Sequence, residues 1–206
     1  MNDREITLDH IFAQAKLESE KEDHECHVVE LLRPYLNLKK DHAEAWLLYG
    51  DALRVVGRFP EATAALEMAL ALVPNEKKGI VCARIAMVNE KHVSCVEAEH
   101  WYQTAVNLRV NPPGWLLILR GGNLAAMADH AGALECYQKA ILEDDVDEDE
   151  AYLNMGLVLR ALGQYENALA AFRKALALNP TYAQAHSAVS GLEDIKRTLD
   201  AATKVQ

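Results

Sequence analysis

The sequence predicts an all-helical fold of repeated antiparallel helix pairs, and three sets of residues at a spacing of 35 or 36 positions predict it. The first set holds alanines that recur twice in each repeat, at Ala62 and Ala69, Ala98 and Ala105, Ala133 and Ala140, and Ala168 and Ala175. The second set holds a bulky residue between those alanines, at Leu66, Tyr102, Tyr137 and Phe172. The third set holds a small residue upstream, at Gly50, Ala86, Gly121 and Gly156.

The spacing within each repeat is that of one helix face. Residues at i, i+4 and i+7, such as Ala62, Leu66 and Ala69, lie on the same side of a helix. The small residues let a neighbouring helix approach, and the bulky one fills the space between turns. A mid-helix glycine costs roughly 1 kcal/mol relative to alanine. We therefore expect Gly50, Gly121 and Gly156 to compensate through close helix contacts.

Glycine and proline mark the ends of these helices. Gly57 and Gly163 fall where the first helix of a repeat must end and the chain must turn. Pro74 and Pro180 fall where the second helix must stop, because the residue before a proline is disfavoured in a helix. Each repeat is thus predicted to be a helix, a tight turn and an antiparallel helix.

Residues 43–74 and 149–180 resemble tetratricopeptide repeats. The positions that carry the pattern are Trp46, Gly50, Gly57, Phe59, Ala62, Ala69 and Pro74, and Tyr152, Gly156, Gly163, Tyr165, Ala168, Phe172, Ala175 and Pro180. Two middle units, at about 79–110 and 114–145, are degenerate and lack the turn glycine. The resemblance implies a right-handed superhelical solenoid in which the first helix of each unit lines a concave groove that binds peptides.

This resemblance sets the expected domain organisation. Four repeats are expected at about 43–76, 79–112, 114–147 and 149–182. They follow a divergent helix pair within 1–42, in which Val28, Leu32 and Tyr35 repeat the helical spacing. Residues 183–206 are expected to form a capping helix and tail, with an apolar stripe at Ala185, Val189, Leu192, Ile195 and Leu199.

The composition disfavours several classes of function. The 206 residues carry a net charge of −10, which disfavours binding to nucleic acid and to anionic membranes. Most of that charge lies in 143–150, which holds seven acids in eight positions. The N-terminus has no apolar run of signal-peptide type, and no stretch is long and apolar enough to span a membrane. Four cysteines without a C-x-x-C pair favour a cytoplasmic protein with reduced thiols.

The inward-facing positions of the family predict a binding groove. Carried onto this sequence, they give a peptide-binding set of Arg54, Arg84, Met87, Trp115, Ile118, Leu119, Asn154, Leu157 and Arg160. The centre of this set is apolar and its rim is basic, and exposed apolar patches mark interaction sites. We therefore expect an adaptor that holds an amphipathic helix or an extended segment with acidic flanks from another protein. The family's clamp for chaperone tails is not expected, because only Asn154 matches it.

Alternatives to an open groove remain at this stage. Trp115 could be shifted by two residues into the core, as Trp46 is expected to be, and residues 1–42 could cover the apolar floor. The chain could instead be a self-associating scaffold and form a homo-oligomer. It could also be an accessory or regulatory subunit, or a chaperone, of an enzyme encoded elsewhere.

Motifs for chemistry are weak. His24, Cys26 and His27 are clustered, but no second ligand pair suggests zinc. The acidic run lacks the glycine of a calcium loop and is better explained as the first turn of a helix. No phosphate-binding loop, nucleophile elbow or H-E-x-x-H motif occurs. We expect no enzyme, no catalytic residue, no metal and no cofactor.

Overall fold

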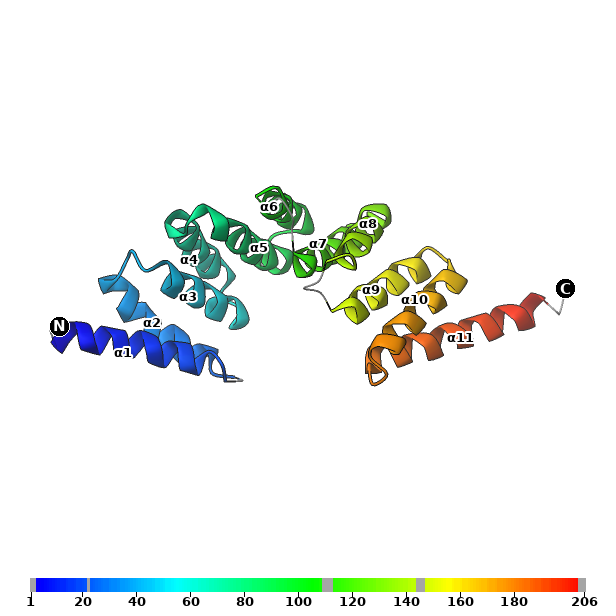
Figure 1. The fold of residues 1–206 in the computed structure, drawn as a ribbon, viewed down its shortest axis with the longest axis horizontal. Coiled ribbons are helices and arrows are strands. Elements are labelled where there is room, and N and C mark those ends of the chain that lie inside the picture. The colour runs from blue at the N-terminus through cyan, green and yellow to red at the C-terminus, as the bar shows by residue number, and fades with distance from the viewer. Residues whose placement is uncertain (1–2, 22, 109–112, 144–146, 204–206) are drawn as a thin grey trace. The chain divides into compact units, whose positions relative to one another are not determined.

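The computed structural model describes residues 3–21, 23–108, 113–143 and 147–203, and within them the chain forms helices and no strand. The helices follow one another as antiparallel pairs (Figure 1). They are α1 (Asp3–Glu18), α2 (Glu25–Leu38), α3 (Ala43–Val55), α4 (Phe59–Leu72), α5 (Asn75–His92), α6 (Cys95–Asn107), α7 (Gly114–Ala126), α8 (His130–Ala140), α9 (Glu148–Ala161), α10 (Tyr165–Leu178) and α11 (Ala183–Thr203). The predicted all-α architecture of helix pairs is confirmed.

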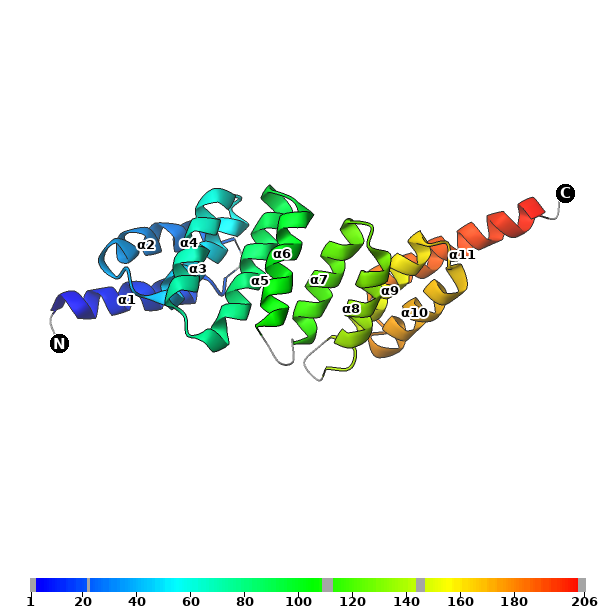
Figure 2. The ribbon, with the colours of Figure 1, turned by 90° about the horizontal axis from the view of Figure 1, so that it is seen from above.

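The chain divides into two compact units. Unit 1, Met1–Val110, contains α1 to α6, and unit 2, Asn111–Gln206, contains α7 to α11. Within each unit every helix packs on the next, as Figure 2 shows for α3 to α6 and for α7 to α10. Odd-numbered helices also touch one another, α3 against α5 in unit 1 and α9 against α7 and α11 in unit 2.

The upstream small residues allow the two helices of a pair to pack closely. A Cβ added at Gly50 would lie 2.7 Å from Cγ of Leu66, and one added at Gly121 would lie 2.5 Å from the Tyr137 ring. At Gly156 it would overlap the Phe172 ring. The bulky residue of the second helix therefore occupies the space that the glycine leaves free, as the sequence spacing predicts.

The repeated alanines and bulky residues form the core. All eight alanines that recur in the four repeats are fully buried, at 0 % exposure. The bulky residues between them are buried to the same extent or nearly so, at Leu66, Tyr102, Tyr137 and Phe172. This regular stack explains why a spacing of 35 or 36 residues is visible in the sequence, because each repeat buries its face against the next helix.

Four turns between paired helices use a left-handed residue, and the α1–α2 turn does so at Asp23, with φ of 62°. Gly57 and Gly163 have φ of 78° and 72° at the predicted turns. The α7–α8 turn has the same conformation at Ala128, with φ of 61°, although this repeat lacks the turn glycine. The α5–α6 turn differs, since Val93 has φ of −108° and Ser94 caps α6 by accepting a hydrogen bond from the Glu97 amide.

The two ends of the chain are also helical. Val28, Leu32 and Tyr35 of α2 are buried in the unit 1 core, and Phe12 of α1 stacks on Tyr35. At the other end, α11 buries Ala185, Ala188 and Leu192 against the preceding pair, whereas Ile195 is 40 % exposed. Leu199, the last member of the predicted stripe, lies outside the side chains that the structure describes.

Candidate functional site

The predicted groove residues all lie on odd-numbered helices. Arg54 is on α3, Arg84 and Met87 are on α5, and the remaining residues are on α7 and α9. The structure thus groups three of them in unit 1 and six in unit 2. We call the side formed by α1, α3 and α5 the odd-helix face of unit 1, and the side formed by α7, α9 and α11 the odd-helix face of unit 2.

An ion pair between two helices lies on the odd-helix face of unit 1. Nη1 of Arg84 on α5 donates to Oδ2 of Asp51 on α3, and the two side chains remain 37 % and 21 % exposed. The other Asp51 oxygen and Nε of Arg84 are buried and have no hydrogen-bond partner within the described part of the chain. Buried polar atoms are nearly always paired in folded proteins. This pair therefore retains unused hydrogen-bonding capacity next to solvent.

Arg54 adds a second cation one turn further along α3. It is half-buried, and its Nε is likewise buried without a partner among the described residues. Its positive charge lies close enough to the buried Tyr102 hydroxyl of α6 to oppose the rise in the pKa of that group, which burial causes. Asp51, Arg54 and Arg84 thus bring several unsatisfied polar atoms to one place.

Glu90 and the Tyr102 hydroxyl complete this polar group, which we call the unit 1 polar cluster: Asp51, Arg54, Arg84, Glu90 and Tyr102. Burial raises the pKa of Glu90, and the neighbouring Tyr102 hydroxyl opposes that rise. Sequence reasoning missed these two groups. The signal in the sequence is the repeat register, in which Tyr102 occupies the bulky position and Glu90 lies one helical turn beyond the small position Ala86.

The remaining features of the unit 1 face are a flexible apolar side chain and an exposed ion pair. Met87 is half-buried, one turn after Arg84 on α5. Nζ of Lys16 on α1 lies 2.7 Å from Oε1 of Glu44 on α3, with both side chains more than half exposed. Such exposed ion pairs contribute little to the free energy of unfolding. A charged group of a bound protein can therefore replace Lys16 or Glu44 in the pair at little cost.

The odd-helix face of unit 2 is more apolar. Trp115 and Leu119 of α7 and Leu157 of α9 are half-buried, and Leu157 packs against the core that α9, α10 and α11 share. Asn154 and Arg160 of α9 are also half-buried. These five side chains keep part of their surface accessible.

Ile118 does not share this exposure. It is only 5 % exposed and packs in the core with Leu117, Leu124 and Tyr137. The adjacent glycines Gly121 and Gly122 left the register of this helix ambiguous in the sequence. Ile118 therefore packs in the core beneath the odd-helix face of unit 2 and offers almost no surface to a partner. Trp115, by contrast, lies outside the buried core.

The His24–His27 segment is held by carboxylates. Nδ1 of His24 lies 2.5 Å from Oε2 of Glu18, and Lys21 donates to the other Glu18 oxygen at 2.9 Å. These two contacts lower the pKa of Glu18 to about 2. Across the described residues, no group of three or more His, Cys, Asp or Glu side chains is placed to hold a metal ion.

The acidic run ends in the first turn of α9. This helix begins at Glu148, and Asp149 accepts a hydrogen bond of 2.9 Å from the Asn179 amide at the end of α10. Acidic side chains at a helix N-terminus interact favourably with the helix dipole. Residues 144–146 of the run lie outside the described residues, so the structure shows only its ends.

No helix among the described residues combines the length and the apolar character that crossing a membrane needs.

Comparisons with known proteins agree with this geometry. Two family models described as "Tetratricopeptide repeat" match residues 30–77 and 149–182. No curated protein matches the sequence.

Solved structures match over most of the chain. The MamA protein has a TM-score of 0.64 and 21 % identity, over 79 % of this chain and 86 % of its own. YrrB, described as a TPR protein with an unusual peptide-binding site, has a TM-score of 0.64 and 23 % identity, over 84 % and 87 %. The Arabidopsis OM64 TPR domain has a TM-score of 0.54 and 25 % identity, over 59 % and 98 %. With two segments matched by the family models and helix pairs that superpose on these structures, the chain is a tetratricopeptide repeat protein.

Proposed function

We propose that the chain is an adaptor whose odd-helix faces bind a segment of a partner protein. The observation that carries this proposal is the unit 1 polar cluster, where buried atoms of Asp51, Arg54 and Arg84 lack partners beside solvent. Unsatisfied buried groups cost roughly 1–3 kcal/mol each. A bound segment that satisfies them recovers part of that cost, which favours association at this face.

The two faces favour different chemistry in a bound segment. Arg54 has no ion pair among the described residues, so the unit 1 face favours a carboxylate of the partner. Trp115, Leu119 and Leu157 favour an apolar stretch at unit 2, because aromatic side chains that bury large areas dominate interface energetics. We therefore propose an amphipathic helix or an extended segment that carries acidic residues as the ligand.

Capture from a lysate of the native host, followed by mass spectrometry, tests this proposal. Two variants remove the faces separately: Arg54→Gln/Arg84→Gln for unit 1 and Trp115→Ala/Leu119→Asp for unit 2. Val96→Asp on α6 is the matched control, since Val96 is 64 % exposed and lies on an even-numbered helix. Circular dichroism first establishes that all four proteins fold equally.

The outcomes separate the functions. A protein captured by the wild type and by Val96→Asp, but lost from a face variant, supports the adaptor. Equal capture by every variant contradicts binding at the odd-helix faces. Capture of the chain by itself alone, with a mass that grows with concentration in light scattering, favours the self-associating scaffold instead.

We also propose that the chain itself is not an enzyme, since we assign the half-exposed polar groups of the unit 1 polar cluster to recognition of a partner. We also propose a cytoplasmic location, supported by four cysteines that form no disulfide with one another, of which Cys82 and Cys136 are buried. Fractionation of host cells, with detection of the chain by a specific antibody, tests the location.

A further inference from the structure

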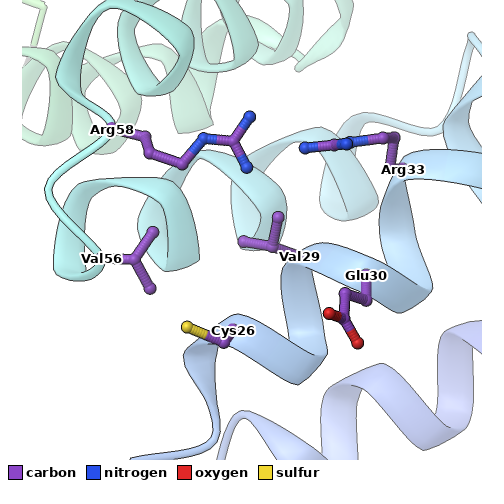
Figure 3. Close-up of a pocket in the computed structure, with 6 residues that line it drawn as sticks. All are labelled: Cys26, Val29, Glu30, Arg33, Val56 and Arg58. Carbon is purple, nitrogen blue, oxygen red and sulfur yellow. The ribbon is translucent and has the colours of Figure 1, made fainter.

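A pocket of about 460 Å³ lies in unit 1 between α2 and the α3–α4 turn, away from the odd-helix face (Figure 3). Its lining residues are Cys26, Val29, Glu30, Arg33, Val56 and Arg58. Val29 is 4 % exposed and Val56 is half-buried, so both present apolar surface to the pocket from the core side. The volume lies within the roughly 300–1,000 Å³ of small-molecule sites. The other four lining residues are charged or carry a thiol, so this pocket is more polar than most such sites.

Two arginines from different helices meet at one end of this pocket. Figure 3 shows the guanidinium groups of Arg33 and Arg58 turned toward one another above Val29. Each is held by a neighbour: Nε of Arg33 donates a long hydrogen bond of 3.5 Å to the Tyr49 hydroxyl, and Nε of Arg58 donates to Oε1 of Glu61 at 2.7 Å. Arg58 is thus oriented before any ligand arrives, which lowers the entropic cost of binding, whereas the single long contact of the exposed Arg33 holds its side chain only loosely.

The charges at this end are only partly balanced. Glu61 pairs with Arg58, whereas Arg33 forms no ion pair with any carboxylate in the described ranges. The other acid of the lining, Glu30, directs its carboxylate away from the two guanidinium groups in Figure 3. The pocket therefore has a surplus of about one positive charge at its arginine end, beside an apolar floor.

We propose that this pocket binds a carboxylate carried on a short aliphatic stem. The carboxylate is held by Arg33, whose planar fork matches it, with Arg58 as a second donor. The stem lies over Val29 and Val56. One negative charge fits better than the two of a phosphate monoester, because Glu61 already neutralises Arg58 and Glu30 lies nearby. A free organic acid and a peptide C-terminus share this chemistry.

NMR titration of the ¹⁵N-labelled full chain at constant ionic strength tests the proposal. The probes are butyrate, acetate, n-butylammonium, N-acetylleucine and N-acetylleucine amide. We expect butyrate to give saturable shifts at residues of α2 and the α3–α4 turn, and to bind more tightly than acetate. The Arg33→Gln variant should weaken butyrate at least tenfold, whereas Arg173→Gln, at an exposed arginine on α10 of unit 2, should leave it unchanged.

The source of the carboxylate follows from the same titration. Tighter binding of N-acetylleucine than of its amide and of butyrate identifies a peptide C-terminus, and tighter binding of butyrate identifies a free acid. Equal shifts with n-butylammonium, or an unchanged affinity in Arg33→Gln, would overturn the proposal. Because Arg33 is exposed and on the surface of α2, an unchanged amide spectrum away from the pocket shows that the variant still folds.

Discussion

The two units pack their helices in the same way but present different chemistry on their odd-helix faces. In unit 1, Asp51 and Arg84 join α3 to α5 through an ion pair, and Arg54 remains without one. In unit 2, the corresponding side offers Trp115, Leu119 and Leu157. The core contacts, such as Gly50 with Leu66 and Gly156 with Phe172, therefore recur in both units, whereas the residues of the odd-helix faces differ in charge and polarity.

The largest change in the free energy of unfolding is expected at the mid-helix glycines, which face an aromatic ring in unit 2 and a leucine in unit 1. Gly156→Ala in unit 2 places a Cβ against the rigid Phe172 ring, and we expect a loss of about 2 kcal/mol in the free energy of unfolding. Gly50→Ala in unit 1 meets the flexible Leu66 side chain, so its loss should be below about 1 kcal/mol after the gain in helix propensity.

Urea unfolding followed by circular dichroism measures both values. Gly191→Ala on α11 serves as the control, because nothing lies within 4 Å of a Cβ at that position. This control should stabilise the chain slightly. Equal losses for Gly50→Ala and Gly156→Ala would contradict the view that the aromatic ring makes the unit 2 pair less tolerant.

The next effect concerns the left-handed turns. Ala128 has φ of 61°, which costs an alanine roughly 1 kcal/mol relative to glycine. Ala128→Gly should therefore raise the free energy of unfolding by about 1 kcal/mol, and Gly163→Ala should lower it by a similar amount. Thermal unfolding of both variants checks this, and a destabilised Ala128→Gly would show that the turn is held by something other than this conformation.

A smaller effect is expected from the ion pair of the unit 1 face. Asp51→Asn removes the charge opposite Arg84, and because both side chains are partly exposed the loss of stability should be about 0.5 kcal/mol. A comparison change in unit 2, Asn154→Ala, removes no ion pair among the described residues and should be nearer zero. Unfolding at low and high salt distinguishes them, since only the Asp51→Asn difference should shrink as salt rises.

The smallest effect is local and depends on pH. Contacts with Lys21 and His24 hold the pKa of Glu18 at about 2, below the ordinary value of 4.5. A lowered carboxyl pKa stabilises the folded state above the ordinary value, and that contribution disappears as the pH falls from about 4.5 to 2.

Hydrogen exchange of the α1–α2 turn measures this contribution directly. Protection should fall over that pH range in the wild type and change less in Glu18→Gln. The same pH dependence in both proteins would assign it to other carboxyl groups.

The helix pairs and their core could be predicted from the sequence because each repeat buries the same positions. Gly50 and Leu66, or Gly156 and Phe172, are direct neighbours in space, so their spacing in the chain reports a real contact. The α7–α8 turn was harder, since Ala128 adopts a conformation that glycine usually marks.

The face residues were predicted less completely. Ile118 is buried because the rotation of α7 about its axis depends on packing with α8, and the adjacent glycines carry no side chain that would fix it in the sequence. The pairing of Arg84 with Asp51 joins residues 33 positions apart in the chain, and the effect of the Tyr102 hydroxyl on the pKa of Glu90 depends on how α5 and α6 pack. Residue types alone do not specify such contacts.

The most direct test of the central claim is quantitative capture of the same partner by four proteins: wild type, Arg54→Gln/Arg84→Gln, Trp115→Ala/Leu119→Asp and Val96→Asp. If the odd-helix faces bind the partner, the amount bound should fall about tenfold or more in each face variant, which corresponds to ~1.4 kcal/mol, and stay at the wild-type level in Val96→Asp. Wild-type capture by both face variants, or a loss confined to Val96→Asp, would contradict the claim and move the binding surface to the even-numbered helices.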